Sequence, residues 1–111
     1  MLKSLRIDYT LRAEVPIDEV KAAIAAFVAG IAAHHPGNLY TSYQHARDPR
    51  RFTHVGEFAE DQVASLQAQA FFPRFTAFLK ERCEQAPEVT MLERVASTRD
   101  LERARPARLD R

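Results

Sequence analysis

The clearest pattern in the N-terminal part of the chain is a strict alternation of apolar and polar residues in LRIDYTLRA, residues 5–13. A period of two predicts a β-strand with one face on a core, and Pro16 ends it. In the next segment, IDEVKAAIAAFVAGIAAHH (residues 17–35), apolar residues recur at steps of three and four. This spacing predicts an amphipathic helix, which Pro36-Gly37 ends.

Two short segments then predict an antiparallel hairpin. LYTSYQHA (residues 39–46) and RFTHVGEF (residues 51–58) favour strands, and Asp48-Pro49 between them is typical of a turn. If the turn is centred between Pro49 and Arg50, His45 and His54 lie directly opposite each other across the hairpin.

A second helical region is predicted to begin near Asp61. Pro73 interrupts its apolar stripe, so we expect a kinked or two-part helix with Pro73 in the first turn of the second part. EVTMLERVA (residues 88–96) predicts the last strand. The order β-α-β-β-α-β predicts an α+β, ferredoxin-like fold, in which a four-stranded antiparallel sheet carries both helices on one face.

The other face of the predicted sheet needs a cover. The first strand presents Arg6, Asp8, Thr10 and Arg12 there, a mixed polar surface. A small domain commonly covers such a face with a second copy, which predicts a homodimer. We expect residues 1–97 to form the domain and residues 98–111 to form a charged tail that contacts the partner subunit.

Composition narrows the class of protein. The 111 residues are 46% apolar, and no stretch approaches the ~20 apolar residues of a membrane span. The N-terminus lacks the apolar core of a signal peptide, and the single cysteine, Cys83, cannot form an internal disulfide, which favours the cytoplasm. A net charge of +1 and three glycines argue against nucleic-acid and dinucleotide binding.

The four histidines are candidates for chemistry. His34 and His35 end the first predicted helix, where imidazole suits the helix dipole, and they lie too far from the hairpin to share an ion with His45. The pair His45 and His54 has three possible roles: a metal site with a third ligand, a polar group of a pocket acting as proton acceptor or hydrogen-bond donor, or ordinary placement near the sheet end. We expect no metal.

The same register predicts a pocket. It places Tyr43, His45, His54 and Phe58 on one face, together with Leu39 and Thr41, and directs that face towards the helices. The aromatic part of the second helical region would form the opposite wall, from Phe71, Phe72, Phe75 and Phe78, with Gln69 and Arg74 as its polar members. Such a cavity suits a small aromatic molecule. The alternatives are that the phenylalanines fill the core and that Arg74 is a solvated helix charge.

The span from Leu5 to about Val95 resembles the antibiotic-biosynthesis monooxygenase (ABM) domain family. The resemblance rests on the order of elements and on short motifs: Pro36-Gly37 after the first helix, Asp48-Pro49 followed by Phe52, and Leu66, Pro73 and Phe75 in the second helical region. Gln69 and Arg74 stand where family members often carry histidines, and Phe58 stands nearest to a common tryptophan.

This resemblance implies a dimeric α+β barrel built from two sheets. Because the helix histidine and the tryptophan are absent, it favours the branch of cofactor-free oxygenases that act on aromatic quinols or phenols over haem degradation. It implies no cofactor, His54 or His45 as base, Arg74 as anion stabiliser, and a substrate site including Tyr43, Phe58, Gln69, Phe71 and Phe75. The alternative is a non-catalytic ligand-binding or interaction module on the same scaffold.

Overall fold

The computed structural model describes residues 2–35 and 37–98 and confirms the α+β, ferredoxin-like arrangement. All pairs in the sheet are antiparallel, and the strand order is β2-β3-β1-β4. The elements are β1 (Leu2–Thr10), α1 (Ile17–His34), β2 (Leu39–Gln44), β3 (Arg51–Ala59), the short 3-10 turn η1 (Glu60–Gln62), α2 (Val63–Gln67), α3 (Phe71–Arg82) and β4 (Glu88–Leu92).

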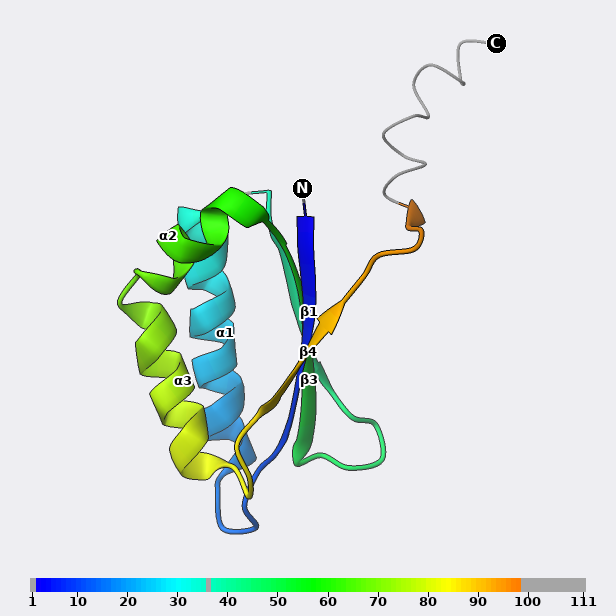
Figure 1. The fold of residues 1–111 in the computed structure, drawn as a ribbon. Coiled ribbons are helices and arrows are strands. Elements are labelled where there is room, and N and C mark those ends of the chain that lie inside the picture. Colours follow the sequence, from blue (N-terminus) through cyan, green and yellow to red (C-terminus); the bar gives the residue numbers. More distant parts are fainter. Residues whose placement is uncertain (1, 36, 99–111) are drawn as a thin grey trace.

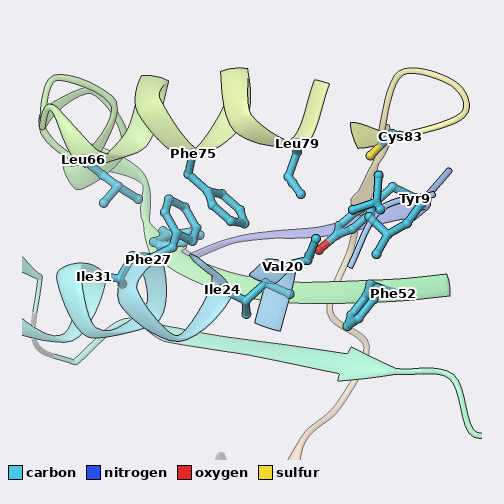
Figure 2. Close-up of a cluster of buried hydrophobic side chains, with 13 residues drawn as sticks. Tyr9, Val20, Ile24, Phe27, Ile31, Phe52, Leu66, Phe75, Leu79 and Cys83 are labelled. Atoms are coloured by element: carbon cyan, nitrogen blue, oxygen red, sulfur yellow. The ribbon is translucent and has the colours of Figure 1, made fainter. Parts of the chain in front are cut away.

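The helices cover one face of the sheet, and the core lies between the two layers (Figure 1). Figure 2 shows Phe75 and Leu79 reaching from α3 into this layer, opposite Phe27 of α1. The buried apolar residues are Tyr9, Leu11, Val15, Val20, Ile24, Phe27, Ile31, Phe52, Phe58, Leu66, Phe75, Leu79 and Cys83. Burial of these side chains is the main force that holds the helices on the sheet.

The second helical region is divided as predicted. The short helix α2 ends at Gln67, and α3 begins at Phe71, so the chain bends over residues 68–70. Pro73 is the third residue of α3, in the first turn, where a missing N–H leaves no helix hydrogen bond unmade. The bend lets α3 lie along α1, with the Phe71 ring packed against Gly30.

The hairpin is confirmed, but its predicted register is wrong. In the structure Ser42 is the partner of His54, and the backbone N–H of His45 donates to the carbonyl of Arg51. The turn itself forms at Asp48, whose carbonyl accepts from the N–H of Arg51 at 3.0 Å. Residues 45–47 are extra length on the β2 side of that turn.

The shift has a large effect because it moves the pairing by an odd number of residues. Side chains alternate across a strand, so the whole of β2 presents the face opposite to the predicted one. Tyr40 therefore lies on the side of the helices, and Tyr43 lies on the outer side of the sheet.

The first and the last strand end earlier than predicted. β1 ends at Thr10, so Arg12 does not extend the outer face, and its Nε donates to the carbonyl of Cys83 at 3.2 Å. β4 ends at Leu92, and the chain then runs away from the helices (Figure 1). Apart from Thr98, the charged tail that we expected to contact the partner subunit lies outside the described residues. Within residues 2–35 and 37–98, no helix is long and apolar enough to cross a membrane.

Candidate functional site

His54 is the central polar group of the protein interior. It lies in the middle of β3, its side chain is 0% exposed, and both ring nitrogens are engaged. Nε2 lies 2.8 Å from the hydroxyl of Tyr9, and Nδ1 lies 2.7 Å from the hydroxyl of Tyr40. A neutral imidazole carries one N–H, so one tyrosine donates to His54 and the other accepts from it.

Strand alternation brings these three side chains together. On β1 the helix-facing positions include Ile7, which pairs with His54, and Tyr9 follows two residues along. On β2 the corresponding position is Tyr40, which pairs with Gly56. A Cβ on Gly56 would lie 2.9 Å from the Tyr40 ring, so the missing side chain provides the space in which this ring lies.

Burial keeps the three groups neutral. Desolvation lowers the pKa of His54 from its ordinary 6.5 to about 4, because the charged imidazolium would lose its hydration. The same cause raises the pKa of the Tyr9 and Tyr40 hydroxyls above the ordinary range. At neutral pH the triad is therefore a chain of uncharged hydrogen-bonding groups.

An apolar cavity of about 400 Å³ is lined by two members of this triad, Tyr40 and His54. It lies between α3 and the sheet and is lined by Leu5, Ile7, Phe27, Tyr40, His54, Phe58, Phe72, Phe75, Thr76, Leu79, Lys80, Ala86, Pro87 and Val89. Its size and apolar walls suit a planar aromatic molecule.

The structure brings some of the sequence-predicted residues to this cavity. His54, Phe58 and Phe75 line it. Phe71 and Arg74 line a separate hollow of about 200 Å³ between α1 and α3, and Phe75 borders both spaces. Gln69 lies in the bend between α2 and α3, and its backbone N–H donates to the carbonyl of Leu66.

Tyr43 and His45 do not line the cavity. Tyr43 is 55% exposed on the outer side of the sheet. Nε2 of His45 lies 2.7 Å from the hydroxyl of Thr53, which donates to Asp8 at 2.6 Å. The expected pairing of His45 with His54 is therefore wrong, because the longer β2 arm turns these residues outward.

Sequence reasoning missed the two tyrosines that hold His54. The signal for Tyr9 was present, since the alternation in residues 5–13 placed it on the apolar face of the first strand. Tyr40 was missed because the predicted register placed it on the face of β2 that points away from the helices.

A metal site was one of the alternatives for the histidines. Among the residues that the structure describes, no group of three or more His, Cys, Asp or Glu side chains is placed to hold a metal ion. Nδ1 of His34 lies 2.9 Å from the carbonyl of Gly30, and His35 forms the cap of α1.

Comparison with known proteins links the chain to one structural group. No protein-family model and no curated protein matches it in sequence. A solved antibiotic biosynthesis monooxygenase is 20% identical, has a TM-score of 0.73 and covers 86% of this chain and 100% of its own. A candidate monooxygenase of this kind from Bacteroides thetaiotaomicron is 14% identical, with a TM-score of 0.76 and coverage of 86% and 90%.

A third similar structure is that of a protein with a more specific description of its activity. SnoaB, a cofactor-independent oxygenase from Streptomyces nogalater, is 14% identical, has a TM-score of 0.70 and covers 86% of this chain and 95% of its own. At these identities the likeness is one of fold. The described chain thus has the fold of the antibiotic biosynthesis monooxygenases.

Proposed function

We propose that this protein is a cofactor-independent monooxygenase that oxidises an aromatic phenol or quinol with O2. The observation that carries the proposal is the apolar cavity that ends on the hydrogen-bonded pair Tyr40 and His54. The fold shared with solved oxygenases supports it.

The chemistry balances without a further reductant. In the oxidation of a phenol to a quinone, a ring C–H and the phenolic O–H are lost. One atom of O2 becomes the new carbonyl oxygen, and the other leaves as water with the two hydrogens. The substrate supplies all four electrons, so the protein has to bind it, move protons and exclude bulk water.

Tyr40 is the group best placed to touch the substrate hydroxyl, because it lines the cavity while its own hydroxyl contacts Nδ1 of His54. The phenol gives its proton to the Tyr40 oxygen as Tyr40 gives its own to Nδ1. This direction requires the tautomer in which Nε2–H donates to Tyr9. The lowered pKa of His54 leaves Nδ1 unprotonated at neutral pH, and it makes the imidazolium a strong enough acid to return the proton readily to the departing oxygen.

His54 remains the proposed base, but the residues around it differ from those expected. His45 and Arg74, also expected to act, do not line the cavity, nor do Tyr43 and Gln69. Tyr40 takes the place in the substrate site that was expected for Tyr43. Phe58 and Phe75 remain as proposed walls of the substrate site.

Oxygen uptake with 1-naphthol and larger polycyclic phenols tests this function. His54→Gln should lower the rate by about 100-fold, within the range for loss of a general base. His45→Gln is the matched control and should leave the rate unchanged, since His45 contacts Thr53 on the outer face. Equal rates in wild type and His54→Gln, with circular dichroism unchanged, would refute the base.

A non-catalytic binding module on the same scaffold is the second candidate. One observation favours it: both nitrogens of His54 are already engaged by tyrosines of the protein. Saturable binding of aromatic ligands, with no oxygen uptake above the buffer rate for any phenol tested, would select this candidate.

We also propose that two copies pair through the outer faces of their sheets. Leu39, Tyr43 and Leu92 expose apolar surface, and no helix covers this face in the described part of the chain (Figure 1). Asp8 is already paired with Arg6 at 2.8 Å and accepts from Thr53 at 2.6 Å. A copy could therefore cover these charges without leaving them unpaired.

A further inference from the structure

Helix α3 presents one face to the apolar cavity. The residues on it recur at steps of three and four, as one face of a helix requires. They are Phe72, Phe75, Thr76, Leu79 and Lys80. The hydroxyl of Thr76 is used within the helix, where it donates to the carbonyl of Pro73 at 3.0 Å.

Lys80 is the charged residue of the described lining, and it lies exposed at the end of this row. The next cation along the helix, Arg82, is held by Glu19 at 3.1 Å, by Glu81 at 3.6 Å and by the ring of Phe78 at 3.7 Å. Within residues 2–35 and 37–98, no carboxylate pairs with Lys80 in this way. Its ammonium group is available to a ligand.

The other lining residues that the structure describes carry no competing charge. At the inner end, Tyr40 and His54 are neutral and bonded to each other. Nearby acidic residues, Glu84 and Glu88, line a separate polar hollow that shares Ala86 with the cavity. An ammonium beside an otherwise apolar space favours a ligand with an aromatic body and a negative group.

We propose that the cavity selects planar aromatic ligands that carry an anionic oxygen group, a carboxylate or an ionised phenol, which pairs with Lys80 at the mouth. This inference rests on the proposed function, because it takes the cavity to be the substrate site. To that function it adds that the substrate is negatively charged and that Lys80 is the residue that recognises this charge.

Two fluorescent probes of matched shape test the proposal on the full-length protein. 8-Anilinonaphthalene-1-sulfonate carries a negative group, and N-phenyl-1-naphthylamine has the same aromatic body without it. Lys80→Met removes the charge and keeps most of the length of the side chain. Lys21→Met, on α1 and outside the cavity lining, is the matched control. Val89→Trp fills the cavity wall and reports whether the probes enter there.

Lys80→Met should weaken binding of the anionic probe about three- to fivefold, as expected for a partly exposed charge pair. Binding of the neutral probe should stay unchanged, and Lys21→Met should affect neither. Added salt should weaken only the anionic probe in the wild type. Val89→Trp should weaken both probes.

Unchanged affinity of the anionic probe in Lys80→Met, or an equal loss for both probes, would overturn the role of Lys80 and leave the proposed oxygenase standing. Failure of both probes to bind the wild type, or full binding to Val89→Trp, would overturn the cavity as a ligand site and the proposed function with it.

Discussion

The hydroxyl of Tyr40 lies 2.7 Å from Nδ1 of His54, inside the protein and at the end of an apolar cavity. The two residues come from adjacent strands, and Gly56 provides the space in which the tyrosine ring lies. Tyr9 holds the other nitrogen of the imidazole at 2.8 Å. The two hydrogen bonds fix the orientation of the imidazole, and only Tyr40 of the two tyrosines lines the cavity.

Tyr40→Phe and Tyr9→Phe should separate catalysis from stability. Each leaves one nitrogen of a buried imidazole without a partner, which costs about 1–3 kcal/mol in the free energy of unfolding. Tyr40→Phe should also lower the rate of oxygen uptake about 100-fold, because it interrupts proton transfer to His54. Tyr9→Phe should lower it much less. Equal effects of the two variants on the rate would contradict the direct role of Tyr40.

Stability should fall as the solution is acidified from neutral pH. The pKa of His54 is lowered from 6.5 to about 4 in the folded state, so between these values the unfolded chain binds a proton that the folded chain does not. The contribution of neutral His54 to the free energy of unfolding is complete above pH 6.5. It is lost as the pH falls towards 4, and the total loss is about 3 kcal/mol.

Urea unfolding near pH 7 and near pH 4.5 measures this loss. In His54→Gln the difference between the two free energies of unfolding should be smaller by about 2 kcal/mol, since glutamine does not titrate. An equal difference in wild type and variant would show that His54 is not the group responsible.

Gly56→Ala should disturb the site while the strand remains. The added Cβ would lie 2.7 Å from the Phe58 ring and 2.9 Å from the Tyr40 ring, so one ring must move. We expect a cost of about 1–3 kcal/mol in the free energy of unfolding, typical of overpacking. The ¹⁵N resonance of His54 Nδ1 should shift as its bond to Tyr40 changes. An unchanged resonance would contradict the positioning role of Gly56.

Tyr43→Asp and Leu92→Asp should prevent pairing of two copies, because each places a charge on the apolar part of the outer face. Light scattering at micromolar concentration should give a dimer for the wild type and a monomer for these variants. Ala22→Asp, on the exposed side of α1, is the control and should remain dimeric. A monomeric wild type would refute the interface.

Local patterns carried much of the fold. The alternation in residues 5–13 predicted β1, the apolar stripe of residues 17–35 predicted α1, and Pro73 predicted the division between α2 and α3. These features depend on neighbours along the chain, so the sequence displays them directly. Burial of His54 and Phe58 on the side of the helices also followed, because the parity along β3 was assigned correctly.

Which residues form the site depended on contacts between residues that are far apart in the sequence. The turn at Asp48 leaves residues 45–47 on one arm, and this odd shift exchanges the two faces of β2. Tyr40 consequently meets His54, while His45 turns to Thr53 and Asp8. By itself, the sequence determined the elements and their order, since periodicity and breakers are local; only the tertiary structure decided which strand face meets the helices, because pairing register is set across the sheet.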